Sequence, residues 1–406
     1  MRLLFTFIIG LILMSCQNEK QDYSPVGVYL GELKVLDDEI LPFNFEVLSD
    51  STVVFTNAEE KISTSEVLFL KDSVTIKLPV FEAYIKAKIN ADKWEGEYVK
   101  ESLDRIVEFT AIQGVKDRFT VKSNGNRADV SGVWETTFSP DVEEDSYVAK
   151  GVFKQEGNKV TGTFMTETGD YRFLEGVVDG QELKLSTFDG AHAFFFKAKL
   201  TDSIMDGMFY SGNHYKEPFI AKRNERFELT DANDLTYLKE GYESFEFNFP
   251  DVNGKMLSLN DQRFEGKPVL VQIMGTWCPN CLDESKFYSK FYNAQQNKDV
   301  EIVALAFEYA KTEASAVKAI NRLQNGVGME YPVLLAQYGT SSKSKANEKL
   351  PMLNHVLSYP TTIYLDKNHE VYKIHTGFNG PATGEAFEAF KKEFSKTITT
   401  LTQSVN

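Results

Sequence analysis

The chain has 406 residues, of which 42% are hydrophobic and 25% charged, proportions that exclude a wholly disordered chain and a protein with many membrane spans. At roughly 100–200 residues per domain, its length predicts two or three domains. Lys and Arg number 44 against 59 Asp and Glu, which gives a formal net charge of −15. This acidic balance, without a basic run, argues against nucleic-acid binding.

An apolar run follows Arg2 at the amino terminus and covers residues 3–14. As a helix it would be about 18 Å long, too short for a bilayer core of about 30 Å, so it is typical of a secretory signal peptide. It ends in Leu13-Met14-Ser15-Cys16, which resembles the lipobox of bacterial lipoproteins. The resemblance implies removal of residues 1–15 and lipidation of Cys16. The alternative is an ordinary signal peptide with an incidental cysteine.

A lipidated Cys16 would anchor the protein to a membrane of the cell envelope, on the periplasmic or the outer-membrane face. Residues 16–23 are polar and short, and we interpret them as a tether.

Apolar and polar residues alternate over the next two hundred positions, as in half-buried antiparallel strands. The segment IKAKI at 85–89 recurs as FKAKL at 196–200, and Gly27-Val28-Tyr29 recurs as Gly132-Val133-Trp134. Chance similarity between amphipathic strands is the alternative to a true repeat. We predict two copies of a β-meander, at residues 24–113 and 130–223, as two small sheets or one closed barrel.

Residues 224–243 are charged and weakly periodic, and they suit a linker or a short helix. Beyond them, residues 244–406 alternate continuous apolar runs with helical patterns, which predicts an α/β domain. The expected strands are 269–274, 301–307, 331–336, 361–365 and 371–375. The expected helices are 279–295, 313–324, 344–356 with a break near Pro351, and 385–395. The chain as a whole is therefore predicted to be an α+β multidomain protein.

Two cysteines lie three residues apart where the strand 269–274 gives way to a helix, in Trp277-Cys278-Pro279-Asn280-Cys281. Thiols at this spacing can close a local disulfide. Cys278 lies where unpaired backbone N–H groups and the helix dipole favour a thiolate, so it should be the exposed nucleophile. Cys281, one turn deeper, should be the resolving thiol.

Three other readings of the cysteine pair remain open. A structural zinc site would need four ligands, and no second cysteine pair exists. A permanent disulfide would close too small a loop to restrain the unfolded chain much. A peroxidase of the peroxiredoxin type would have Thr or Ser where this chain has Gly275, and Pro where it has Val271.

The region from Phe245 to Lys396 resembles the thioredoxin superfamily, specifically the envelope thiol–disulfide oxidoreductases of the TlpA/ResA type. The residues that carry the resemblance are Phe249-Pro250-Asp251, Gly275 to Cys281, Tyr359-Pro360-Thr361-Thr362 and Thr376 to Pro381. The resemblance implies a C-terminal thioredoxin-like α/β domain in which Cys278 attacks and Cys281 resolves.

The same resemblance implies further roles. Pro360 would be a cis-proline beside the thiols, and the exposed backbone of Tyr359 would pair with an incoming peptide, so that Trp277, Tyr359, Pro360 and Thr361 contact the substrate. Glu284 matches a family glutamate near the thiols; the alternative is an ordinary first-turn glutamate favoured by the helix dipole. Gln272 replaces the family's buried Asp and cannot act as a base, which leaves proton transfer to Glu284 or water.

These patterns predict an envelope enzyme, a thiol–disulfide oxidoreductase that acts mainly as a disulfide reductase. It would need no metal or other cofactor beyond the redox-active pair Cys278–Cys281. Its partners would be protein disulfide and thiol substrates and an upstream thiol electron donor. The alternatives are a ligand- or partner-binding lipoprotein with an accessory redox domain, and a thiol peroxidase.

Overall fold

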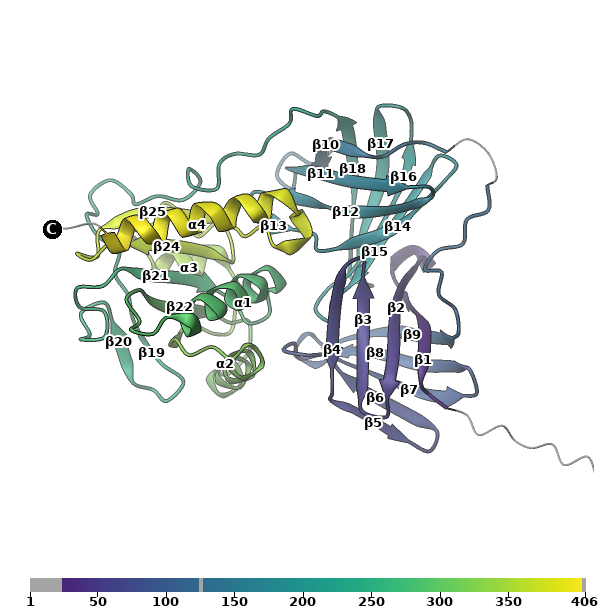
Figure 1. Ribbon diagram of the computed structural model, residues 1–406, viewed down its shortest axis with the longest axis horizontal. Coiled ribbons are helices and arrows are strands. Elements are labelled where there is room, and N and C mark those ends of the chain that lie inside the picture. Colours follow the sequence, from purple (N-terminus) through teal and green to yellow (C-terminus); the bar gives the residue numbers. More distant parts are fainter. Residues whose placement is uncertain (1–23, 124–126, 404–406) are drawn as a thin grey trace, which may run out of the picture.

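A computed structural model describes residues 24–123 and 127–403, so the expected signal peptide and Cys16 lie outside the described residues. Two antiparallel sheets occupy the amino-terminal half, and a mixed sheet with helices forms the C-terminal domain (Figure 1). Strands therefore dominate the chain, and the α-helices of the described residues all lie in the C-terminal domain, where the sequence predicted the α/β pattern. Over the described ranges, no helix combines the length and apolarity needed to cross a membrane.

The first sheet is an up-and-down meander whose last strand pairs with its first. The strand order is β4-β3-β2-β1-β9-β8-β7-β6-β5, so the sheet stays open between β4 and β5. Trp94 is fully buried in its core beside Tyr29 and Phe45. The strands are β1 (Gly27–Lys34), β2 (Ile40–Ser49), β3 (Thr52–Asn57), β4 (Glu60–Thr64), β5 (Val67–Leu70), β6 (Ser73–Lys77), β7 (Tyr84–Asn90), β8 (Lys93–Lys100) and β9 (Arg105–Gln113).

The second sheet has the same meander but closes on itself, because β11 pairs with both β10 and β12. Its core contains the fully buried Trp134, Phe138 and Phe164. The strands are β10 (Gly132–Phe138), β11 (Tyr147–Glu156), β12 (Lys159–Thr166), β13 (Gly169–Asp170), β14 (Leu174–Asp179), β15 (Glu182–Phe188), β16 (Ala193–Leu200), β17 (Ile204–Ser211) and β18 (Tyr215–Arg223).

The repeated sequence motifs occupy equivalent strands in the two sheets. Gly27 and Gly132 begin β1 and β10, each of which pairs with the last strand of its own sheet. The segments IKAKI and FKAKL lie in β7 and β16, two strands before that last strand. The structure therefore resolves the open question in favour of two separate sheets, each with its own core.

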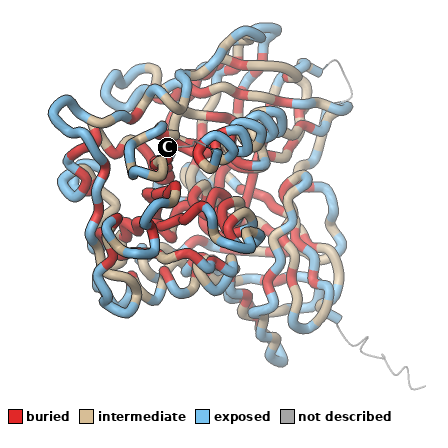
Figure 2. Tube along the Cα trace, turned by 60° about the vertical axis from the view of Figure 1, so that its left-hand side comes forward, coloured by how far each residue is buried: buried red, intermediate tan, exposed pale blue. Residues whose placement is uncertain are grey.

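The C-terminal domain is built on a five-stranded mixed sheet of order β23-β22-β21-β24-β25. The central strands β21 (Val269–Met274) and β22 (Glu301–Phe307) are buried at every residue, whereas β7 alternates between buried and exposed positions. Figure 2 shows buried stretches gathered in the interior of the molecule and exposed stretches around its outside. The other strands are β23 (Val333–Gln337), β24 (Thr361–Leu365), β25 (Val371–Thr376) and the small pair β19 (Asn248–Pro250) and β20 (Met256–Ser258).

Four α-helices accompany this sheet: α1 (Pro279–Ala294), α2 (Glu313–Val327), α3 (Lys343–Lys349) and α4 (Glu385–Gln403). Two expected helices need correction. The helix expected over 344–356 ends at Lys349, because Pro351 cannot continue it. The closing helix extends well past Ser395, where Leu401 still lies on its buried face.

The segment 224–243 forms no helix; it runs along the C-terminal domain in an irregular conformation. Backbone bonds attach it there, since Thr376 N donates to Ala232 O and Lys239 N donates to Met352 O. This segment is therefore held against the C-terminal domain by backbone hydrogen bonds.

Both sheets also contact the C-terminal domain directly. Arg322 Nε in α2 donates to Val80 O at 2.6 Å, and Ser358 Oγ donates to Thr168 O at 2.9 Å. The loop 166–172 of the second sheet, which includes the short strand β13, lies beside the first turn of α1.

Candidate functional site

The two thiols lie at the start of α1, directly beyond the buried strand β21. Cys278 is the N-cap residue, and its Sγ accepts a hydrogen bond of 3.2 Å from the backbone N–H of Cys281. Pro279 occupies the first helical position, where a backbone N–H would have no partner within the helix, so proline loses no hydrogen bond there. Both cysteines are free thiols, and Cys278 lies at the positive end of the helix dipole.

The thiols are less accessible than the sequence predicted. Cys281 is completely buried, as expected, but Cys278 is also only 7% exposed. The expectation of an exposed Cys278 was wrong because distant segments of the chain pack around the motif. Burial, and then the neighbouring Cys278, raise the pKa of the Cys281 thiol well above its usual value. Cys281 is thus a protonated thiol until something removes its proton.

The loop that carries the cis-proline lies against the redox pair. The Tyr359–Pro360 peptide bond is cis, and the Cys278 thiol donates to Tyr359 O at 3.2 Å. The rings of Trp277 and Tyr359 meet edge to face, 5.5 Å apart, and Thr361 is buried. The carbonyl oxygen of Tyr359 therefore already accepts a hydrogen bond within the protein. This corrects the expectation that the backbone of Tyr359 is exposed and free to pair with a peptide.

Glu284 lies inside the domain, one turn beyond Cys281, and has no exposed surface. Its carboxylate accepts hydrogen bonds from Gln272 Nε2 at 2.8 Å and from Thr362 Oγ1 at 2.9 Å. Burial raises the pKa of Glu284 to about 7, and its charge acts in turn on the Cys281 thiol. Gln272, which replaces a carboxylate in the family pattern, thus serves as a hydrogen-bond partner of Glu284.

A second buried carboxyl flanks the motif and was missed in the sequence. Glu308 follows β22 and accepts hydrogen bonds of 2.7 Å from both the backbone N–H and the hydroxyl of Thr276. Burial raises its pKa to about 7 as well. A lone glutamate after a buried strand carries no distinguishing sequence signal, so only the fold places it beside the redox pair.

The loop 166–172 is the other unforeseen component of the site. Asn280, between the two cysteines, donates through Nδ2 to Asp170 O at 3.3 Å, and the Asp170 carboxylate accepts from Gly380 N at 2.6 Å. Gly169 approaches so closely that a side chain there would collide with the Asn280 amide. One domain therefore packs directly on the redox motif of another.

A buried arginine holds this loop in place. The Arg172 guanidinium pairs with Asp283 of α1, with Glu60 at 2.8 Å and with Asp189 at 3.3 Å. These carboxylates come from the C-terminal domain, the first sheet and the second sheet respectively. Within the described residues, no group of three or more His, Cys, Asp or Glu is arranged to hold a metal ion.

The comparisons with known proteins concern the C-terminal domain. Residues 239–389 match the Redoxin family. The thioredoxin-like protein YneN of Bacillus subtilis is 27% identical over 140 residues, 34% of this chain and 73% of the relative. The thiol-disulfide oxidoreductase ResA of Bacillus thuringiensis is 27% identical over 155 residues, 38% of this chain and 78% of the relative.

Among solved structures, a thiol:disulfide interchange protein DsbE from Chlorobium tepidum aligns with a TM-score of 0.30 and 19% identity, over 40% of this chain and 99% of that one. The match to Redoxin and the relatives of the ResA type agree with the dithiol and the neighbouring cis-proline described above. These matches support a C-terminal domain similar to the TlpA/ResA-like thiol–disulfide oxidoreductases of the thioredoxin superfamily.

Proposed function

We propose that the protein is a lipid-anchored thiol–disulfide oxidoreductase of the cell envelope that works as a disulfide reductase. The observation that carries the proposal is the free dithiol Cys278/Cys281 at the start of α1, with the Cys278 thiol in contact with the cis-proline loop. The partners are disulfide-bearing substrates, protein disulfides among them, and an upstream thiol electron donor. No metal or nucleotide is required by this chemistry.

The reaction has two exchange steps. The Cys278 thiolate attacks one sulfur of the substrate disulfide, forms a mixed disulfide and expels the other sulfur as a thiolate, which takes up a proton. Cys281 then attacks the Sγ of Cys278 and releases the second substrate sulfur as a thiol. The substrate gains two electrons from the dithiol, which ends as the Cys278–Cys281 disulfide. A fresh dithiol from the donor restores the starting state.

Glu284 is the group we assign to proton transfer at Cys281. The pKa of the Cys281 thiol is raised, so this thiol must lose a proton before it can resolve the mixed disulfide. Glu284, whose pKa is about 7, can accept that proton near neutral pH.

The direction of the reaction is tested by the reduction potential of the Cys278/Cys281 pair. Equilibration of the full chain with dithiol buffers, followed by alkylation of free thiols, gives the potential. A value of about −270 mV or below supports a reductase, whereas a value near about −120 mV indicates an oxidant and contradicts the proposed direction.

Glu284→Gln is expected to flatten the pH dependence of the resolving step near pH 7 and to slow it by about tenfold above that pH, since general bases contribute at least this much. The variant keeps the shape of the side chain and removes its titration. The measurement is the rate at which a preformed mixed disulfide on Cys278 is released, followed from pH 5 to pH 9. Glu308→Gln is the matched control, because Glu308 has a similar pKa but faces Thr276. An unchanged profile in Glu284→Gln removes the assignment.

The same substitution has a stability signature. Burial raises the pKa of Glu284 from 4.5 to about 7, so the neutral carboxyl favours the folded state. This contribution is present below pH 4.5 and is lost as the pH rises through 7. Between pH 4.5 and pH 8, the titration of Glu284 should lower the free energy of unfolding of the wild type by about 2–3 kcal/mol. Glu284→Gln has no such titration, so its free energy of unfolding should not fall by this amount. Urea unfolding at both pH values checks this difference.

Cys16→Ser is expected to abolish anchoring, because the proposed lipid can attach only to that thiol. The proposal is supported by the lipobox-like Leu13-Met14-Ser15-Cys16. Metabolic labelling with a fatty acid, together with fractionation of membranes, measures the effect. Ser15→Ala is a suitable control, since it leaves the cysteine in place. Unchanged lipid labelling of Cys16→Ser excludes the lipoprotein.

A further inference from the structure

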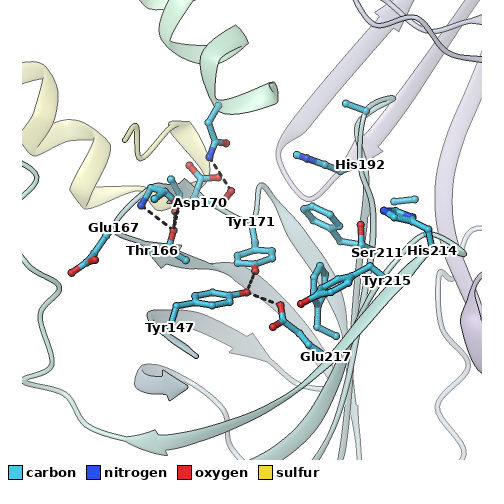
Figure 3. Close-up of a pocket in the computed structure, with 18 of the residues that line it drawn as sticks. Tyr147, Thr166, Glu167, Asp170, Tyr171, His192, Ser211, His214, Tyr215 and Glu217 are labelled. Atoms are coloured by element: carbon cyan, nitrogen blue, oxygen red, sulfur yellow. Dashed lines mark hydrogen bonds between the residues drawn. The ribbon is translucent and has the colours of Figure 1, made fainter. Parts of the chain in front are cut away.

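A large cleft lies where the two sheets meet the C-terminal domain, and its volume is about 1130 Å³. All three units line it: Lys100 and Arg105 come from the first sheet, His192 and Tyr147 from the second, and Asn280 and Lys343 from the C-terminal domain. Figure 3 shows His192 and His214 on one side of this cleft and Glu167 and Asp170 on the other. Pockets of about 300–1000 Å³ suit small molecules, so this cleft has room for a short peptide.

The cations and the carboxylates that line the cleft differ in whether they already have hydrogen-bond or ion-pair partners within the protein. Asp170 accepts hydrogen bonds from the backbone of Gly380 and Arg172, and Glu217 accepts from Tyr147 and Ser139, as part of the Tyr147–Tyr171 chain in Figure 3. The carboxylates therefore already have partners within the protein.

Lys100 and Arg105, by contrast, form no ion pair with any carboxylate of the described residues. Lys100 Nζ donates only to a neutral acceptor, Ala191 O, at 2.8 Å. Burial, and then repulsion from Arg105, lower the pKa of Lys100 to about 8. Asp189, the acidic group that acts on Lys100, is already paired with Arg172 and His192. The first-sheet wall of the cleft thus carries positive charge without a counter-charge.

The cleft leads to the redox motif. Asn280 lines it from between the two cysteines, and Lys100 also lines a small adjoining cavity together with Trp277 and Thr276. The Asn280 Oδ1 atom is buried and has no hydrogen-bond donor. A buried acceptor without a partner is uncommon in proteins, and a ligand N–H group would reach this atom once the Asn280 amide turns toward the cleft.

The other approach to the thiols is narrowed by the second sheet. Thr168 O accepts from Ser358, directly before Tyr359, and Glu167 O packs closely on Gly377. A folded protein therefore cannot lay an extended edge along this loop in the arrangement observed. The cleft meets the motif at Asn280, and this is the side from which a slender substrate would approach.

We propose that this cleft is the substrate site of the redox pair and that it selects disulfides carried on short acidic peptides. A substrate carboxylate would bind Lys100 and Arg105, and a peptide N–H would donate to Asn280 Oδ1, which places the disulfide beside Cys278. The inference rests on the proposed function, because the substrate must be a disulfide. The chemistry is the exchange given above: each peptide disulfide takes two electrons and two protons and leaves as two thiols.

The test uses the reduced full chain and two small disulfides of opposite charge, oxidised glutathione and cystamine. Rapid mixing, acid quenching and alkylation give the rate constant for oxidation of the Cys278/Cys281 pair by each. We expect the double variant Lys100→Gln/Arg105→Gln to react at least about tenfold more slowly with oxidised glutathione, since it loses charged hydrogen bonds, and no more slowly with cystamine. Lys86→Gln/Lys88→Gln is the matched control, because it makes the same charge change on exposed positions of β7.

A measurement on the wild type alone guards against a variant that misfolds. Added salt should slow the reaction with oxidised glutathione and leave or raise the rate with cystamine, because it screens the positive wall. A disulfide-linked pair of glutamate-rich peptides should react as fast as oxidised glutathione if the site accepts peptides, and more slowly if it admits only small disulfides.

Equal losses with both disulfides in the double variant, or the same change in the control variant, overturn the inference while leaving the proposed function intact. So does a slow reaction of the glutamate-rich peptides. Failure of the wild type to react with either disulfide, or with insulin, overturns the proposed function itself.

Discussion

Replacing Cys281 with serine is expected to leave the protein joined covalently to its substrates. Cys278 retains its position at the helix N-terminus and can still attack, but nothing releases the mixed disulfide. Cys278→Ser should reduce thiol exchange to the uncatalysed background, because the nucleophile is lost. Non-reducing gels and mass spectrometry of the native envelope read out the trapped species and also identify the substrates.

The reciprocal pair of variants provides the control. Trapping by Cys278→Ser and not by Cys281→Ser would reverse the assigned roles, despite the complete burial of Cys281. If neither variant trapped a partner and a metal co-purified with the wild type, the oxidoreductase assignment would be contradicted.

Arg172→Met is expected to lower the free energy of unfolding by about 3–5 kcal/mol, the range for a buried ion pair that loses one partner. Arg172 is 3% exposed, and its removal leaves Asp283, Asp189 and Glu60 in a poorly solvated interface without their cation. The loop 166–172 should then separate from α1, so the Cys278 thiol should be alkylated faster. Urea unfolding and the alkylation rate measure the two effects.

Arg226→Met is the matched control, since Arg226 is exposed and should change the unfolding free energy by less than about 0.5 kcal/mol. Adding Asp283→Asn to Arg172→Met should restore part of the lost stability, because it removes one of the unpaired charges. Equal effects of Arg172→Met and Arg226→Met would show that the buried cluster does not hold the domains together.

The sequence predicted the C-terminal domain well because its signals are local. The strands 269–274, 301–307 and 361–365 have the expected bounds, since continuous apolar runs bounded by polar residues mark fully buried strands. The proximity of the two thiols could be predicted equally well, because both lie on one helical turn. The two meanders could be predicted as strands, but the pairing of the last strand with the first joins residues far apart in the sequence, such as Tyr29 and Gln113 in the first sheet.

The local patterns could not predict packing between segments far apart in the sequence, either within the C-terminal domain or between units. Neither the burial of Cys278 nor the position of Glu308 follows from a local pattern, because both depend on segments over thirty residues away. Arg172 and Asp283 are 111 positions apart, and each alone is an ordinary charged residue of a loop or helix. The cleft with Lys100 and Arg105 arises only when three separately predicted units are brought together.

The three tryptophans are distributed one to each unit: Trp94 in the core of the first sheet, Trp134 in the core of the second, and the partly buried Trp277 beside Cys278. Their fluorescence can therefore report the unfolding of each sheet and the redox change at Cys278 separately. Emission from Trp94 and Trp134 should shift to the red only when the respective core admits water. Emission from Trp277 should be quenched or restored as the neighbouring sulfurs change between dithiol and disulfide. Three variants that each retain one tryptophan would follow catalysis through Trp277 and the unfolding of the two sheets through Trp94 and Trp134, without an added dye.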